Sequence, residues 1–229
     1  MMNVSEAVAK RQSVRGFLDR DVDLSLLREL IEKALRAPSG GNIQPWHIHV
    51  VAGDRLSDLK AIMAERIAEA PGGEGTEYDI YPKELTAPYR DRTFEVGQLL
   101  YARLGIPRED KAGRARWFAR NFAFFGAPVG LFCYVDRRHG PPQWSDLGMY
   151  LQTLMLLLTE HGLASCAQEC WALYPRSVGE FLGAPADQML FTGMSIGWPD
   201  PDAPDNDVRM PRAPIDEVVS FHVDATGTR

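Results

Sequence analysis

The segment at residues 127–136, APVGLFCYVD, restricts the fold most strongly, because it is apolar on both of its alternating faces. A strand with one face in water alternates apolar and polar residues, whereas a strand covered on both faces is apolar throughout. We therefore expect this segment to be an inner strand of a sheet with packing on both sides.

The flanking segments alternate between helix and strand patterns. Apolar residues recur at helical spacing over 23–37 and 54–70, and residues 47–53 between them alternate as a strand does. Asp23 is a suitable N-cap for the first helix, and Pro38 is expected to end it. Similar patterns predict helices at 94–104, 108–120 and 175–182, and strands near 164–167 and 189–198.

Residues 144–161 form a long segment that is apolar nearly all round and is followed by Gly162. Such a pattern predicts a helix buried by more than one neighbour, with a second subunit among the candidates, and a glycine at its C-terminal end.

Two segments show no sustained period. Residues 71–92 mix glycine, proline, charged residues and three tyrosines, which predicts a functional or mobile excursion. Residues 199–229 are rich in proline and aspartate, and such an arm is expected to find its contacts on a partner subunit. With 229 residues, 45% of them hydrophobic, we expect one domain over 1–229 that carries a lid-like excursion and a C-terminal arm.

Charge and composition restrict the kinds of partner and the cellular location that we expect for this chain. A net charge of −6 leaves no basic stripe for nucleic acid. The first residues lack the apolar core of a signal peptide, and the apolar run from Leu147 is too short for a membrane span, so we expect a cytoplasmic protein. Cys133, Cys166 and Cys170 are odd in number and fit no disulfide framework.

The strong catalytic motifs are missing from the sequence. It contains no phosphate-binding GxxxxGK[ST] loop, no GxSxG nucleophile elbow and no HExxH zinc motif. His47 and His49 share one side of a strand, but no cluster of Cys, Asp or Glu accompanies them, so we expect no metal.

Two stretches carry more polar groups than their local structure requires. In RQSVRGF, Arg11, Ser13 and Arg15 alternate and would point one way in an extended segment. Guanidinium groups are matched to phosphate and carboxylate oxygens, so this is either an anion clamp or a solvated basic patch. The second stretch, APSGGNIQPWHIHV at 37–50, joins a helix to a strand.

Together these stretches resemble the FMN-dependent nitroreductase family. The matching positions are Arg11, Ser13, Arg15 and Phe17, then Pro38, Ser39, Asn42, Gln44, Pro45 and Trp46. Segments 78–92, 104–111, 124–132 and 144–157 look most like the nitrobenzoate-reductase type. The resemblance implies an α+β, three-layer α/β/α fold with a mixed central sheet flanked by helices. It also implies a homodimer that exchanges its C-terminal arms and has its active sites at the interface.

The resemblance further implies a set of cofactor ligands. Arg11, Gln12, Ser13 and Arg15 would contact the FMN phosphate, ribityl chain or ring edge, and Pro38, Ser39, Gly40 and Asn42 would reach the flavin from the other subunit. Ala167, Gln168 and Glu169 would lie near the flavin N5 atom, and Arg212, with Arg209 as a weaker candidate, would meet the phosphate. Met210 and Cys170 depart from residues frequent in the family at these places.

The implied activity is reduction of nitroaromatic compounds, with quinones as a further option, by NADH or NADPH. FMN would carry two electrons as hydride through N5 in alternating half-reactions, so no side-chain acid or base is expected to be catalytic. The alternatives are a reductive dehalogenase or a flavin-fragmenting enzyme on the same fold, and a non-enzymatic FMN-binding protein. A dehalogenase acting on an amino acid would need charges such as Glu77, Lys83 and Glu84 in its lid. Tyr78, Tyr81, Tyr89 and Trp144 could either line a pocket for a small aromatic substrate or pack the excursion down.

Overall fold

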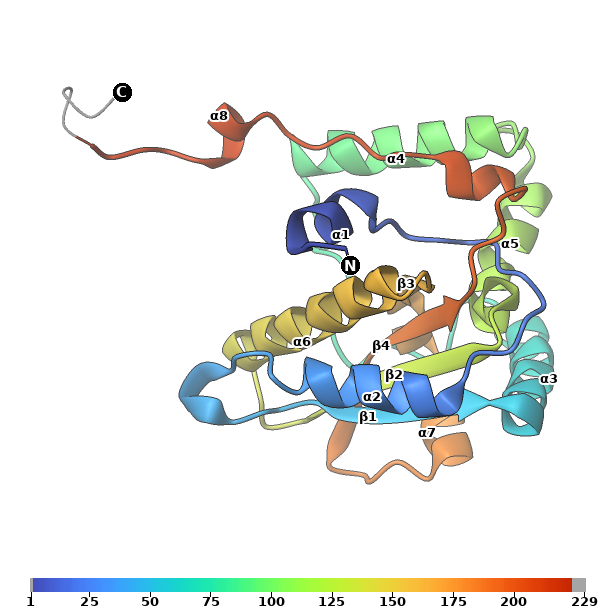
Figure 1. Cartoon of the computed structure of the whole chain (residues 1–229). Coiled ribbons are helices and arrows are strands. Elements are labelled where there is room, and N and C mark those ends of the chain that lie inside the picture. Colours follow the sequence, from blue (N-terminus) through green and yellow to red (C-terminus); the bar gives the residue numbers. More distant parts are fainter. Residues whose placement is uncertain (1, 224–229) are drawn as a thin grey trace.

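Strand β2 (Val129–Asp136) is an inner strand of a four-stranded sheet in the computed structural model, which describes residues 2–223 (Figure 1). The order is β1-β2-β4-β3, with β1 at His47–Ala52, β4 at Gln188–Gly197 and β3 at Ala164–Gln168. Leu131 and Cys133 of β2 belong to one hydrophobic core, whereas Phe132 and Tyr134 belong to another. The prediction of an inner strand covered on both faces is confirmed.

The sheet is antiparallel, and the expectation of a mixed sheet is wrong for the described residues of one chain. Each of its three strand pairs is antiparallel, with Leu131 opposite Met194 in the central pair. Among residues 2–223 the parallel pairing is limited to one isolated bridge, between Ser13 and Ser165. The apolar patterns could not reveal this, because they report burial and carry no information on strand direction.

Helices cover both faces of the sheet. On one face lie α2 (Leu24–Ala34) and α6 (Pro141–Glu160), which contribute Leu30 and Leu154 to the core. On the other face α3 (Gly53–Glu69), α5 (Lys111–Ala119) and α7 (Pro175–Leu182) pack with the short helical segments η2 (Arg120–Gly126) and η3 (Glu169–Leu173). The three-layer fold is therefore confirmed, and so is the buried helix predicted at 144–161.

Local signals set several of the element ends. The Asp23 carboxylate accepts a hydrogen bond from the Ser25 backbone N–H at 2.8 Å, as expected of an N-cap. Gly162 follows α6 with a φ of +77°, which a glycine adopts without strain, and its N–H donates to the Thr159 carbonyl. Helix α2 ends at Ala34, a few residues before Pro38.

The remaining helical segments are mostly exposed. They are α1 (Val4–Lys10), α4 (Tyr89–Arg103), α8 (Ile215–Val218), η1 (Gly40–Asn42) and η4 (Pro204–Asp207). Because α4 begins at Tyr89, the last four residues of the expected excursion belong to a helix. Within residues 2–223, no helix has the length and apolar character needed to cross a membrane.

The arm leaves β4, follows α4 and then extends away from the body of the molecule (Figure 1). Two ion pairs hold it to α4: Arg103 with Asp207 at 2.7 Å and Arg92 with Glu217 at 2.8 Å. Residues 224–229 of the predicted arm lie outside the described residues.

Candidate functional site

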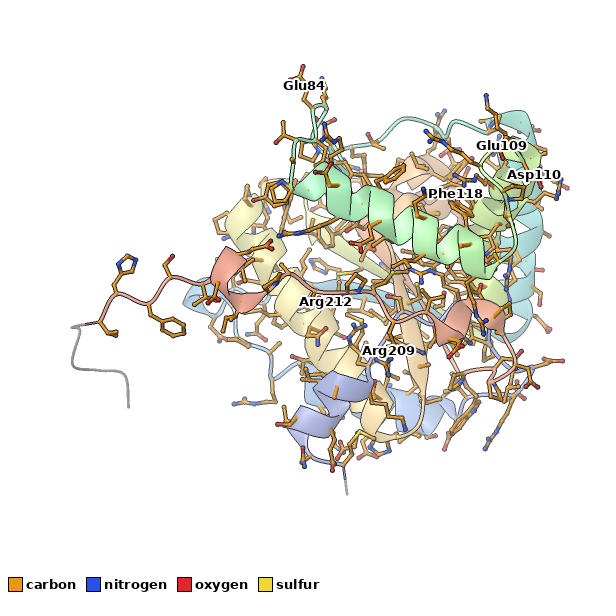
Figure 2. All side chains as sticks on the ribbon, turned by 90° about the horizontal axis from the view of Figure 1, so that it is seen from above. Glu84, Glu109, Asp110, Phe118, Arg209 and Arg212 are labelled. Atoms are coloured by element: carbon orange, nitrogen blue, oxygen red, sulfur yellow. The ribbon has the colours of Figure 1, made fainter. Side chains whose placement is uncertain are left out.

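Arg209 and Arg212 lie where the arm passes α1 (Figure 2), and both are close enough to Arg11 to affect its charge. Arg11 follows α1 directly, Arg209 donates to the carbonyls of Ala9 and Lys10 at 3.0 and 3.2 Å, and Arg212 donates to carbonyls of the arm. Burial lowers the pKa of Arg11, and the positive charges of Arg212 and Arg209 lower it further. Within residues 2–223 none of the three is paired with a carboxylate. Such a cluster of like charges favours a bound anion.

The segment after α1 continues this site along the edge of β3. Ser13 forms its bridge with Ser165, and the Val14 N–H donates to the Ser165 carbonyl at 3.1 Å. Burial raises the pKa of the Cys166 thiol, and this is opposed by Arg15, by a hydrogen bond with Ser13 and by Arg11. Arg11, Ser13 and Arg15 therefore all lie near this thiol.

Gln12 points elsewhere. Its side-chain amide donates to the Asn206 carbonyl of the arm at 2.7 Å. The residue therefore ties the segment after α1 to the arm.

The far end of β3 presents a small side chain and a carboxylate. Ala167 is exposed, and Glu169 follows at the start of η3, about 13 Å along the chain from Ser165 at the usual rise of a strand. Burial raises the pKa of Glu169, and a hydrogen bond from Tyr81 of the excursion opposes that rise. Cys170 packs against the core behind them.

Gln168, in contrast, uses its side chain inside the protein. Its amide nitrogen donates to the Asn121 carbonyl at 2.7 Å, and its amide oxygen accepts from the Ser195 hydroxyl at 2.7 Å. Its side chain is therefore not available to a ligand.

The loop of the second motif lies at the N-terminal end of α6, away from the arginine cluster (Figure 1). Pro38, Gly40 and Asn42 are exposed, and Ser39 is partly buried and accepts from the Gln44 N–H at 3.0 Å. The Gly40 N–H lies 3.3 Å from both carboxylate oxygens of the buried Asp146. A single chain therefore does not bring the two motifs together.

The tyrosines of the excursion have different surroundings. The Tyr78 hydroxyl donates to the Phe191 carbonyl, and its ring packs on Trp144 and Phe191 with centroids 5.5 and 5.9 Å apart. Tyr78 therefore fixes the excursion against Trp144 of α6 and Phe191 of β4. Tyr81 and Tyr89 are each 61% exposed and remain able to contact a ligand.

The two strand histidines lie on β1. His49 packs its ring edge-on against Tyr134 at 5.2 Å, and no three His, Cys, Asp or Glu side chains gather anywhere in the described chain.

Glu74 fixes the base of the excursion to α7. Its carboxylate accepts from the backbone N–H of Ser177 at 3.0 Å and from the Ser177 hydroxyl, and the side chain is only 7% exposed. Burial raises the pKa of Glu74, but the two bonds from Ser177 and the charges of Arg176 and Arg66 outweigh it, so the folded-state pKa lies below 4.5. The stabilisation is therefore complete above pH 4.5 and is lost as the pH falls through the folded-state pKa.

We expect Glu74→Gln to lower the free energy of unfolding by about 1–3 kcal/mol at pH 7, because it weakens two hydrogen bonds to a charged group. Urea unfolding of both proteins between pH 3 and pH 7 measures the difference, which should shrink as the pH falls. A difference that does not change with pH would contradict this role for the carboxylate.

Asn206 and Asp146 were not predicted from the sequence. Asn206 receives the Gln12 amide and lies in the arm, where no period marks individual residues. Asp146 lies within an otherwise apolar helix and is buried. The presence of a carboxylate in such a helix was the sequence signal that could have identified it.

The structure has an antiparallel sheet between two helical layers, with an arginine cluster at one edge of the sheet. Sequence comparisons identify the family of this chain. The model of the Nitroreductase family matches residues 8–198. A nitrobenzene nitroreductase of Ectopseudomonas oleovorans is 34% identical over 95% of this chain and 96% of its own length. A 4-nitrobenzoate reductase of Pseudomonas putida is 38% identical over 90% of this chain and 89% of its own length.

Solved structures give the same result. The FMN and NADPH-dependent nitroreductase NfnB from sphigopyxis sp. strain HMH is 52% identical and superposes with a TM-score of 0.94. The match covers 97% of this chain and 100% of that structure. The chain belongs to the nitroreductase family, and the resemblance inferred from the two sequence motifs is confirmed.

Proposed function

We propose that this protein binds FMN and uses NADH or NADPH to reduce nitroaromatic compounds. The main observation that supports this proposal is that Arg11, Arg209 and Arg212 converge near the edge of β3. None of the three has a carboxylate partner in the described chain. Family membership and the two relatives named for nitrobenzene and 4-nitrobenzoate support the activity. The FMN and NADPH dependence named for the similar structure supports the cofactor and the electron donor.

The residues present fit this cofactor. Burial and the charges of Arg212 and Arg209 lower the pKa of Arg11, and a phosphate dianion placed among the three guanidiniums would offset their mutual repulsion. Ser13 and Arg15 would lie beside the next part of a ligand that ran along β3, and the small side chain of Ala167 would leave room for a flat ring. FMN, when bound, supplies two-electron transfer from the nicotinamide to the acceptor.

The protein itself then has three tasks. The arginine cluster binds the phosphate, the backbone of residues 167–169 orients the ring, and the excursion covers the place where donor and acceptor enter in turn. Exposed Tyr81, next to Glu169, is placed to stack on an aromatic acceptor. Met210 packs against the core, so Arg209 and Arg212 are the basic residues that this part of the arm offers.

We further propose a homodimer in which each site uses both chains. The loop carrying Pro38, Ser39, Gly40 and Asn42 lies apart from the arginine cluster of its own chain, so the partner's loop would complete the site.

The arm also requires a partner surface. Val219, Phe221 and Val223 are exposed and alternate with the polar Ser220 and His222, which is the pattern of a strand without a sheet. A groove of about 1080 Å³ follows β1, the edge strand, between α2 and α7. Its apolar walls include Leu24, Ile31, Leu35, Val50, Phe181 and Leu182. We assign the partner's arm to this groove, because a free strand edge with apolar walls suits an alternating strand.

We expect Phe221→Asp to raise the dimer dissociation constant at least about tenfold, because burial of each phenylalanine contributes roughly 1.5–3 kcal/mol. His222→Asp, on the opposite side of the proposed strand, is the matched control and should leave the dimer intact. Analytical ultracentrifugation measures both. A flavin-loaded wild-type monomer would contradict the shared site.

The activity is tested by oxidation of NADH and NADPH by the FMN-loaded protein with nitrobenzene, 4-nitrobenzoate, a quinone and a halophenol as acceptors. Reduction of a nitro group supports the proposal. Release of halide in place of nitro reduction would favour a dehalogenase, although Glu77, one of the lid charges that such an enzyme would need, is paired with Arg137. Bound FMN without turnover of any acceptor would indicate a binding protein, and protein that takes up no FMN would overturn the proposal.

A further inference from the structure

We propose that Asn206 is a positioning residue that sets the geometry of the phosphate clamp, the cluster of Arg11, Arg209 and Arg212, a role that rests on the proposed binding of FMN. It lies in η4, in the turn through which the arm leaves the sheet, and precedes Arg209 and Arg212 on the same arm. Its partners belong to the segment that carries Arg11, Ser13 and Arg15. The residue therefore joins the two parts of the clamp, which come from opposite ends of the chain.

Both polar atoms of the Asn206 side chain and its backbone carbonyl form hydrogen bonds with the segment after α1, and its backbone N–H donates to the Ala203 carbonyl at 3.0 Å. Its side-chain oxygen accepts from the N–H groups of Arg15 and Gly16 at 2.8 and 3.2 Å. Its side-chain nitrogen donates to the carbonyls of Gly16 and Asp200, both at 2.8 Å. Its own carbonyl accepts from the Gln12 side chain at 2.7 Å. No other uncharged side chain of this length provides both an acceptor and two donors.

Arg15 is held from two sides as a result. Its N–H donates to Asn206, and its carbonyl accepts from the Arg120 guanidinium at 3.0 Å. Arg120 is itself paired with the buried Asp205, next to Asn206, at 3.3 Å. The backbone of Arg15 is thus fixed between Asn206 and Arg120. This in turn restricts the direction of the Arg15 side chain.

The close approach between the segment after α1 and the turn of the arm depends on Gly16. A Cβ at this position would lie 2.3 Å from the Cβ of Ala203, so the clamp and the turn could not approach as they do with any larger residue. The glycine allows the contact, and Asn206 fixes its register through hydrogen bonds.

The test compares two ligands that differ only in the phosphate. Titrations of cofactor-free wild type and Asn206→Ala with FMN and with riboflavin, followed by flavin fluorescence, give four dissociation constants. We expect Asn206→Ala to raise the constant for FMN about tenfold or more, since several hydrogen bonds that orient the clamp are lost, and to raise the constant for riboflavin by a clearly smaller factor. Asn206→Asp keeps the acceptor for Arg15 and Gly16 but lacks the donors, and it should show the same preferential loss of FMN.

The matched control is Asp207→Asn, which removes an exposed ion pair with Arg103 in the same turn and touches none of the clamp contacts. It should bind both ligands as wild type does. Unchanged FMN affinity in Asn206→Ala, or an equal loss for FMN and riboflavin in both Asn206 variants, would overturn the positioning role. Failure of the wild type to bind FMN would overturn the proposed function as well, so the two failures can be told apart.

Discussion

Arg212→Ala is expected to weaken FMN binding about ten- to a hundredfold, because one charge-assisted interaction with the phosphate contributes roughly 1.5–3 kcal/mol. The cofactor-free variant should be at least as stable as wild type. Removing Arg212 also removes a positive charge that lowers the pKa of Arg11, and the lost hydrogen bonds go only to the neighbouring carbonyls of Met210 and Pro211. Thermal unfolding with and without FMN, together with the dissociation constant, measures both effects.

Arg116→Ala on α5 is the control for this variant, because Arg116 is an exposed arginine away from the cluster. It should change neither the affinity for FMN nor the stability gained on binding it. Wild-type affinity in Arg212→Ala would remove Arg212 from the proposed site. Equal destabilisation with and without FMN would mean that the residue acts on folding.

Gly193→Ala is expected to lower the free energy of unfolding by about 2–3 kcal/mol, the largest effect that we predict for a single methyl group. Gly193 lies in β4, and a Cβ there would be 2.2 Å from Cδ1 of Trp171. The indole cannot move aside, because it is fully buried and packs on Phe124 and Phe132 with centroids 4.6 and 4.9 Å away. Urea unfolding measures the loss.

Gly97→Ala in α4 is the matched substitution. A Cβ at Gly97 meets nothing within 4 Å, and alanine in a helix interior is favoured over glycine by about 0.5–1 kcal/mol, so this variant should be slightly more stable than wild type. A Gly193→Ala protein as stable as wild type would show that the aromatic core is looser than described.

Features set by local sequence could be predicted, whereas features set by distant partners could not. The inner position of β2 and the length of α6 followed from their apolar patterns, and the Asp23 cap followed from neighbouring residues. Strand direction left no trace in those patterns, so they could not correct the mixed sheet that the family resemblance implied. The end of the excursion was placed too late, because Tyr89 belongs to a helix whose apolar residues remain largely exposed.

The same distinction applies to the site. The alternation of Arg11, Ser13 and Arg15 predicted one shared side, and the structure places all three near Cys166. Asn206 could not be found from the sequence, because its partners lie about 190 positions away and its own segment has no period. Gln168 was expected at the cofactor, yet Asn121 and Ser195 from other elements take up its side chain.

The most direct test of the proposed function separates its two half-reactions. FMN-loaded protein is mixed with NADPH, and in parallel with NADH, under exclusion of oxygen, and nitrobenzene is then added while the flavin absorbance is followed. The account predicts that the oxidised-flavin absorbance disappears with at least one donor and returns on addition of the nitroaromatic. Flavin that neither donor reduces, or reduced flavin that nitrobenzene does not reoxidise, would contradict it.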